Sequence, residues 1–122
     1  MARILIAEDD PDIAENICAL LNLKGHATTT AADGVLALQQ ARSEMPDLLL
    51  LDVMLPRLSG LDVCRTLRDE SKTAKLKILM VTALGRGADL EDAFAAGADD
   101  YLIKPFDAER LFKKIEKMLS VS

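Results

Sequence analysis

Aromatic residues and cysteines are scarce in this sequence. Its 122 residues include no tryptophan and only 3% aromatic residues, although 50% are hydrophobic, so the core must be mainly aliphatic. The two cysteines, Cys18 and Cys64, both fall at apolar positions of predicted helices. That placement favours two reduced core thiols over a disulfide or a metal-binding pair.

Long apolar runs and an excess of positive charge are also missing. No run approaches the roughly 18 residues of a transmembrane helix. The N-terminal MARILIAEDD turns acidic too soon for a secretory signal. We therefore expect a cytoplasmic protein without membrane association. With 15 basic and 20 acidic residues and a formal charge of −5, a broad nucleic-acid surface and a direct nucleic-acid partner are not expected.

Short apolar segments alternate with longer amphipathic ones along the whole chain. Apolar residues at helical spacing follow each short segment, and the sequence shows no linker and no repeat. The expected strands are 3–7, 26–30, 48–51, 77–82 and 101–103. This order predicts one domain over residues 1–122, an α/β fold in which helices cover both faces of a parallel sheet. The second strand, HATTT, is the most polar and is expected at an edge.

Several helix ends and core positions can also be predicted. Asp10 is expected to cap the first helix, with proline following it. In the second helix, which opens at Asp33-Gly34, we expect Leu36, Leu38 and Ala41 at apolar positions. Met54 and Met118 are most simply packing residues, and the single histidine, His26, is expected at the surface.

Polar residues follow the apolar strands at the same relative place in most units. In an open α/β sheet, ligands bind outside the carboxyl ends of the strands, so these side chains should face one crevice. They are Glu8, Asp9, Asp52, Thr82 and Lys104. The run LLLLD, which ends in Asp52, therefore predicts a buried strand that delivers a carboxylate to a site.

The chemistry of this set points to a metal ion and a phosphoryl group. Three neighbouring carboxylates would repel one another unless a cation lay between them. Oxygen ligands without histidine or cysteine favour Mg²⁺ over zinc. Thr82 and Lys104 could bind phosphoryl oxygens, and a carboxylate can act as a nucleophile toward phosphorus. Asp52 is the candidate acceptor.

Four motifs in this order resemble the receiver domain of two-component response regulators. They are ILIAEDD (4–10), LLLLDVMLPRLSG (48–60), VTA (81–83) and ADDYLIKPF (98–106). The resemblance covers essentially the whole chain. It implies the flavodoxin-like three-layer sandwich of the chemotaxis response regulator, with five helices and strand order 2-1-3-4-5.

The resemblance also implies roles for the site residues. Asp52 would accept a phosphoryl group from a sensor histidine kinase or a histidine phosphotransfer protein. Asp9 and Asp52 would ligate Mg²⁺ directly, Glu8 would act through water, and the backbone carbonyl of Met54 would complete the protein ligands. Such a protein catalyses only its own aspartyl phosphorylation and dephosphorylation, and is otherwise not an enzyme.

The remaining implied roles concern the response to phosphorylation. Thr82 and Lys104 would bind the phosphoryl oxygens. Thr82 and Tyr101 would turn inward and alter the face formed by the fourth helix, fifth strand and fifth helix, which would bind a downstream protein target. The Lys104–Pro105 peptide bond is typically cis in the family. Met54 and Leu84 would flank the phosphorylated aspartate. Because both are apolar, we predict slower dephosphorylation than in a Leu84→Glu variant.

Other functions fit the sequence less well. A haloacid-dehalogenase-type phosphatase needs an acid two residues after the nucleophile, where this chain has Met54. A phosphate-independent module would have lost a key residue, and none is lost. We expect a stand-alone receiver, and the alternative is a receiver cut from a longer DNA-binding regulator or hybrid kinase. Leu90 and Arg110 do not make the basic–acidic pairing frequent in receivers attached to winged-helix DNA-binding domains.

Overall fold

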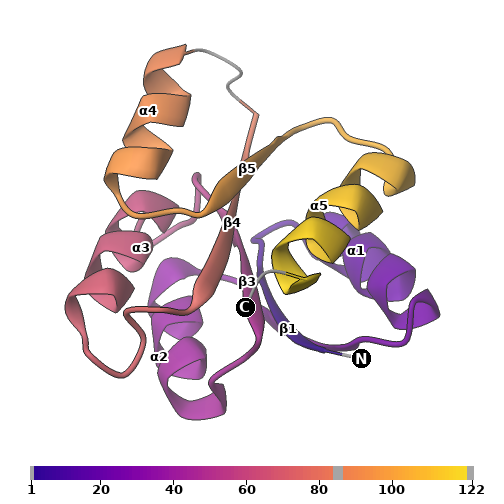
Figure 1. The fold of residues 1–122 in the computed structure, drawn as a ribbon, viewed down its shortest axis with the longest axis horizontal. Helices are drawn as coiled ribbons and strands as arrows, with labels where there is room; N and C mark the ends of the chain where they lie inside the picture. The colour runs from indigo at the N-terminus through magenta and orange to yellow at the C-terminus, as the bar shows by residue number, and fades with distance from the viewer. Residues whose placement is uncertain (1, 84–86, 121–122) are drawn as a thin grey trace.

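Five strands alternate with five helices in the computed structural model, which describes residues 2–83 and 87–120 (Figure 1). The strands are β1 (Arg3–Ala7), β2 (Ala27–Ala31), β3 (Leu48–Asp52), β4 (Lys77–Thr82) and β5 (Asp100–Ile103). The helices are α1 (Pro11–Leu23), α2 (Gly34–Glu44), α3 (Gly60–Asp69), α4 (Gly87–Ala95) and α5 (Ala108–Ser120). The predicted element order is confirmed, and β2 begins one residue later than predicted.

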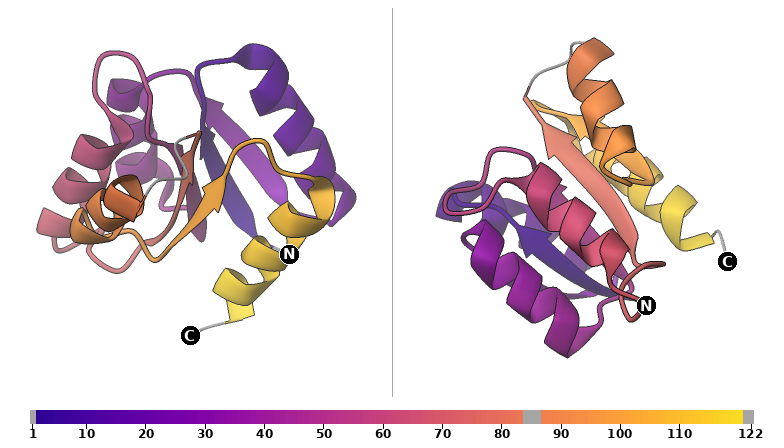
Figure 2. Two further views of the ribbon diagram at one scale, coloured as in Figure 1. Left: turned by 90° about the horizontal axis from the view of Figure 1, so that it is seen from above. Right: turned by 90° about the vertical axis from the view of Figure 1, so that its left-hand side faces the viewer.

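The strands form one sheet in the order β2-β1-β3-β4-β5, and every pairing is parallel. The predicted fold class is therefore confirmed. Helices α1 and α5 cover one face, and α2, α3 and α4 cover the other (Figure 2). The polar strand β2 lies at an edge, as expected. The carboxyl ends of all five strands lie along one side of the sheet, which we call its carboxyl edge. Because β1 and β3 are neighbours, the residues that follow them lie side by side there.

The leucines of β3 explain how the sheet is buried from both sides. All five residues of β3 are buried, because helices cover both faces. Leu48 and Leu50 join the apolar cluster beneath α1 and α5. Leu49 and Leu51 join the cluster beneath α2, α3 and α4. Each buried leucine contributes about 1.5–3 kcal/mol of transfer free energy, which helps to offset placing a carboxylate at the strand end.

Helix ends follow the local sequence. Asp10 caps α1 as predicted, since its carboxylate accepts hydrogen bonds from the backbone N–H groups of Asp12 and Ile13. Asp33 caps α2 by accepting from Leu36 N, and Ser59 caps α3. These caps fix where α2 and α3 begin relative to the strand ends.

Some predicted packing positions are wrong. Met54 is 67% exposed and does not pack in the core. Leu36 is 41% exposed, because α2 turns Gly34, Ala37 and Ala41 toward the protein interior instead. His26 is half-buried rather than fully at the surface, and its Nδ1 accepts a hydrogen bond from Ala2 N.

The two cysteines differ in their surroundings. Both are free thiols; Cys64 is buried and Cys18 is only half-buried. Burial raises the pKa of the Cys64 thiol to about 11, so this group stays protonated at neutral pH. Among the residues that the structure describes, no helix has the length and apolar character to cross a membrane.

Candidate functional site

The carboxyl ends of four neighbouring strands carry the residues predicted to form the site. Glu8 and Asp9 follow β1, and Asp52 is the last residue of β3. Thr82 ends β4, and Lys104 follows β5. Glu8, Asp52 and Thr82 are buried, whereas Asp9 is exposed. Asp9 therefore lies at the solvent-exposed side of the site, and the three buried polar side chains lie beneath it.

The three carboxylates form a compact cluster. One oxygen from each of Glu8, Asp9 and Asp52 lies within 4.8 Å of the other two. The donors are all hard carboxylate oxygens, which suit Mg²⁺ better than the softer metals. Two of the three are buried, so their negative charges are poorly screened by water. This donor set fits a divalent cation.

Lys104 bridges two of these carboxylates. Its Nζ donates hydrogen bonds to Glu8 Oε1 at 2.6 Å and to Asp52 Oδ2 at 3.0 Å. Its backbone N–H donates to Thr82 O at 2.8 Å, and the peptide bond to Pro105 is cis. The lysine side chain is 20% exposed, so the ammonium lies at the boundary between the cluster and solvent.

Burial and charge shift the pKa values of this pair. Burial raises the pKa of the Glu8 carboxyl, although hydrogen bonds from Lys104 and from Asp10 N oppose that effect. Burial alone would lower the pKa of the Lys104 ammonium. The carboxylates of Glu8 and Asp52 more than compensate, so the pKa of Lys104 lies above its usual value. The Lys104 side chain therefore stays protonated and positively charged at physiological pH.

The loop after Asp52 fixes the orientation of its carboxylate. Asp52 Oδ1 accepts a hydrogen bond from Met54 N at 3.0 Å, while Oδ2 faces Lys104. The backbone turns back at once, since Gly60 N donates to Val53 O at 2.9 Å. A Cβ at Gly60 would lie 2.1 Å from Asp52 O, so no larger residue fits without moving the strand end.

A second glycine holds the same loop from the other side. Gly34 N donates to Pro56 O at 3.1 Å, and a Cβ at Gly34 would lie 1.9 Å from Leu58 O. The N-terminus of α2 therefore packs directly against the loop that follows the acceptor candidate. The helix start at Asp33-Gly34 is predictable from the sequence, whereas its contact with this loop is not.

Tyr101 lies on β5, outside the acidic cluster. Its ring meets Phe94 of α4 edge-to-face, with centroids 5.9 Å apart. Lys114 Nζ of α5 lies 4.8 Å from the centroid of the same ring. The tyrosine thus connects α4, β5 and α5. Leu84, for which a role in phosphoryl lifetime was predicted, lies outside the described residues.

The structure brings Glu8, Asp9, Asp52 and Lys104 into one cluster, as their places in the sequence led us to expect. The comparison with known families agrees with this geometry: residues 4–116 match the family described as response regulator receiver domain. The chain belongs to this family. Phosphorylation and Mg²⁺ are typical of receiver domains.

Relatives of this receiver domain include longer regulators. It is 42% identical over 119 residues to the DNA-binding dual master transcriptional regulator RpaA of Synechocystis, covering 98% of this chain and 49% of that protein. It is 44% identical over 117 residues to the response regulator MprA of Mycobacterium ulcerans, covering 96% of this chain and 50% of that protein. The chain spans about half the length of the curated relatives that it matches.

Solved structures of similar proteins share the fold. A putative response regulator from Chloroflexus aurantiacus has a TM-score of 0.93 and 38% identity, covering 98% of both chains. The receiver domain of the sensor histidine kinase PA1611 from Pseudomonas aeruginosa has a TM-score of 0.91 and 32% identity, again covering 98% of both chains. That structure has a magnesium ion coordinated in the active-site cleft. This receiver domain is therefore similar both to response regulators and to receiver domains of kinases.

Proposed function

We propose that this receiver domain is a phosphorylation-activated signalling switch in which Asp52 is the phosphoryl acceptor. The supporting observation is the position of its carboxylate. One oxygen is held by Met54 N and the other faces the Lys104 ammonium, beside two further carboxylates. The proposed donor is a phosphohistidine of a sensor histidine kinase or a histidine phosphotransfer protein.

The transfer itself is a substitution at phosphorus. An Asp52 carboxylate oxygen forms a bond to phosphorus while the bond from phosphorus to the donor's imidazole nitrogen breaks. The electron pair of the broken bond stays on that nitrogen, and the product is an acyl phosphate. Lys104 offers a positive charge to the phosphoryl oxygens, and Thr82 offers a hydroxyl donor, so both lower the energy of the developing charge.

The acidic cluster is the proposed Mg²⁺ site. Asp9 and Asp52 would ligate the ion, Glu8 would act through a water molecule, and the Met54 carbonyl would be the remaining protein ligand. Bound Mg²⁺ supplies neutralisation of the carboxylate and phosphoryl charges. Glu8 also positions Lys104 through the 2.6 Å hydrogen bond, so it links the metal site to the phosphoryl site.

The proposed output is a rearrangement of the face formed by α4, β5 and α5. Thr82 and Tyr101 are the proposed switch residues. The contacts of Tyr101 with Phe94 and Lys114 support this role, because movement of one ring would change packing on both helices. A downstream protein target would bind this face differently before and after phosphorylation. A direct nucleic-acid contact is not part of this proposal.

Incubation with acetyl phosphate, with and without Mg²⁺, tests the proposed acceptor. We expect a mass increase of one phosphoryl group that requires Mg²⁺ and disappears in Asp52→Asn. Asp69→Asn, which changes an exposed aspartate at the end of α3, is the matched control and should behave like wild type. A phosphorylated Asp52→Asn variant would refute the assignment.

The curated relatives favour a second setting for the same switch. RpaA is named a DNA-binding regulator and is about twice as long as the matched region. We therefore propose, as this second setting, that the domain is the receiver of a longer DNA-binding regulator. An antibody raised against residues 1–122 distinguishes the two settings in the source cells. A native protein of about the size of this chain supports a stand-alone receiver, and one of about twice that size supports the longer regulator.

A further inference from the structure

A groove between β5 and α5 carries positive charge that the proposed phosphorylation does not use. Its volume is about 380 Å³. Tyr101, Leu102 and Ile103 line it from β5, and its cationic residues come from α5. They are Arg110, Lys113, Lys114 and Lys117. In a chain of net charge −5, four cations around one groove make a distinct basic surface, which we call the basic groove.

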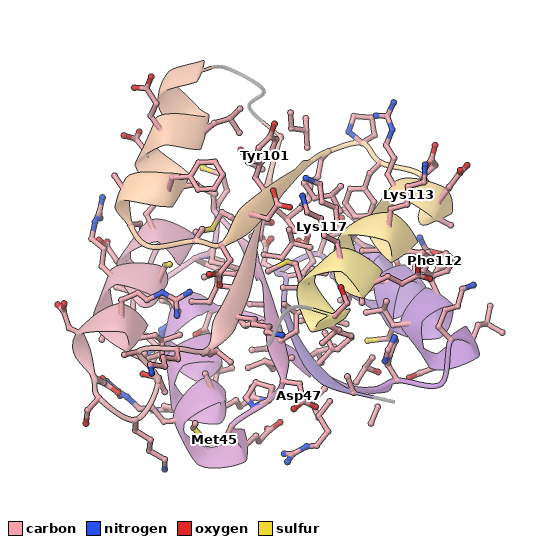
Figure 3. The ribbon with its side chains drawn as sticks, viewed as in Figure 1. Met45, Asp47, Tyr101, Phe112, Lys113 and Lys117 are labelled. Atoms are coloured by element: carbon pink, nitrogen blue, oxygen red, sulfur yellow. The ribbon has the colours of Figure 1, made fainter. Side chains whose placement is uncertain are left out.

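Helical spacing gathers these cations into a single stripe. Positions 110, 113, 114 and 117 recur at the three- and four-residue intervals that share one face of a helix. Leu111, Ile115 and Met118 occupy the buried face of α5 and anchor it to the sheet. Figure 3 shows Lys113 and Lys117 extending from α5 and Tyr101 from the neighbouring strand. The stripe is therefore held in place by the core rather than by its own contacts.

The charges of the groove are not balanced within the domain. Lys114 Nζ pairs with Asp100 Oδ1 at 3.0 Å. Lys113 pairs only loosely with Glu109 at 3.7 Å, and both of those side chains are more than three-quarters exposed. Among the side chains that the structure describes, no ion pair involves Arg110 or Lys117. The groove therefore keeps a surplus of positive charge.

The floor of the groove is less polar than its rim. Leu102 is buried, and Tyr101 and Ile103 are half-buried, so an apolar side chain could contact them. The 4.8 Å contact between Lys114 Nζ and the Tyr101 ring joins the floor to the rim. An apolar floor with a cationic rim is suited to a protein segment that carries both carboxylates and an apolar anchor.

The size and setting of the stripe argue for a short acidic segment over a nucleic acid. Seven residue steps along a helix span about 10 Å, enough for two helical turns of a partner. The net charge of −5 would repel an extended phosphate backbone, which reaches well beyond the groove. A short acidic segment would contact the groove without approaching the acidic remainder of the surface.

We infer that the basic groove between β5 and α5 binds an acidic protein segment with an apolar side chain placed against Tyr101 and Ile103. The inference deepens the proposed output face and rests on that part of the proposed function. It does not require Asp52 to be the phosphoryl acceptor. The attraction is electrostatic, so affinity should fall as salt concentration rises.

Two peptides of equal length provide the probe. Both carry leucines at helical spacing; the remaining positions are glutamate in one peptide and glutamine in the other. We expect the glutamate peptide alone to shift the backbone amide resonances of residues 101–103 and 110–117. Arg110→Gln/Lys117→Gln should weaken its binding about tenfold. Lys72→Gln/Lys75→Gln, which removes two exposed charges elsewhere, should change it less than about twofold.

Several results would overturn the inference. They are a lack of binding, equal binding of both peptides, equal weakening by both double variants, or resonance shifts confined to another surface. Tighter binding of random duplex DNA at the same salt concentration, or displacement of the peptide by self-association of the domain, would also contradict it. Unchanged thermal unfolding of both double variants verifies that they are folded.

A separate measurement distinguishes this inference from the proposed phosphorylation. Arg110→Gln/Lys117→Gln should incorporate phosphoryl groups from acetyl phosphate at the wild-type rate, because neither residue touches the acidic cluster. Peptide binding by a wild-type domain that cannot be phosphorylated would support the groove and refute the acceptor assignment. Normal phosphorylation without peptide binding would support the proposed phosphorylation and refute binding at the groove.

Discussion

Two clusters of lysine and carboxylate in this domain have opposite charge imbalances. At the carboxyl edge of the sheet, three carboxylates cluster together, and one ammonium, that of Lys104, contacts two of them. Four cations line the basic groove, and among them Lys114 pairs closely with a carboxylate, that of Asp100. The first cluster should attract a cation and the second an anion, although the domain as a whole is acidic. Local sums of charge, rather than net charge, therefore indicate what each surface binds.

The two clusters also differ in burial. The side chains of Glu8 and Asp52, the partners of Lys104, are 4% and 7% exposed, whereas that of Asp100, the partner of Lys114, is 16% exposed. A fully buried carboxylate that loses its ammonium cannot be solvated by water, while a more exposed carboxylate is partly solvated. Removing one charge should thus have a larger effect at the carboxyl edge.

The largest expected effect comes from Lys104→Gln. We expect phosphoryl incorporation from acetyl phosphate to fall at least about 100-fold, because the proposed donor to the transferred group is lost. The free energy of unfolding should fall by about 1–3 kcal/mol, since two buried carboxylates lose their ammonium. Urea unfolding and intact-protein mass spectrometry measure these two quantities.

Lys114→Gln is the matched control for Lys104→Gln in the other cluster. It should cost less than about 1 kcal/mol and leave phosphoryl incorporation unchanged. Equal losses of stability in the two variants would show that burial does not separate the clusters as described here.

The next effect concerns the backbone that shapes the carboxyl edge. Gly60→Ala should reduce the free energy of unfolding by about 1–3 kcal/mol, because the new Cβ would overlap Asp52 O. Phosphoryl incorporation should fall with it, since Asp52, the proposed acceptor, is displaced. Gly25→Ala is the control: its backbone has a φ of 86° but no atom lies within 4 Å of the added Cβ. Its phosphoryl incorporation should match wild type, despite a cost of about 1–2 kcal/mol.

A smaller effect should appear when pH is varied. Burial raises the pKa of Glu8 above its ordinary value of 4.5, so the native state without metal binds this proton more tightly than the unfolded state. This contribution to stability is present below pH 4.5 and is lost as the pH rises through the raised value. Mg²⁺ affinity should change in the opposite direction, because the ion competes with the proton.

Titration with Mg²⁺ at several pH values, in wild type and Glu8→Gln, measures this dependence. We expect affinity in wild type to weaken as the pH is lowered through the raised pKa of Glu8, and that component to vanish in Glu8→Gln. An identical pH dependence in both proteins would assign it to another group.

The smallest expected effect belongs to the groove. Asp100→Asn removes the carboxylate that neutralises Lys114 but keeps an oxygen able to accept from Tyr101 N. Binding of the glutamate peptide should strengthen by about 0.2–1 kcal/mol, or up to about fivefold. Fluorescence anisotropy at low salt detects such a change. Weaker binding would show that Asp100 orients Lys114 for the partner.

Much of the fold follows from features that are local in the sequence. The strands β3 and β2 are each recognisable from five consecutive residues, and the cap at Asp10 from the residues next to it; the structure agrees with all three. The gathering of acids and lysine at one edge was predictable too, because parallel strands place their carboxyl ends together.

Features that depend on contacts between distant segments were harder to predict. Ala37 rather than Leu36 faces the interior, because the direction of α2 is set by its packing and not by hydrophobicity alone. The close approach of Gly34 to Leu58 joins the start of α2 to the loop after β3, two segments that no sequence spacing relates. The basic groove requires β5 and α5 to lie side by side. The roles proposed for Asp52, Thr82 and Tyr101 stay predictions.

The hydrogen bond between Lys104 and Glu8 joins residues 96 positions apart in the chain. The pocket is consequently assembled only when β1 and β5, the first and the last strand along the chain, are both in place. A nascent polypeptide still lacking β5, or a proteolytic fragment cut before it, would carry the aspartate without its ammonium. Competence to accept a phosphoryl group would then depend on synthesis having passed β5 and on that strand having paired with β4.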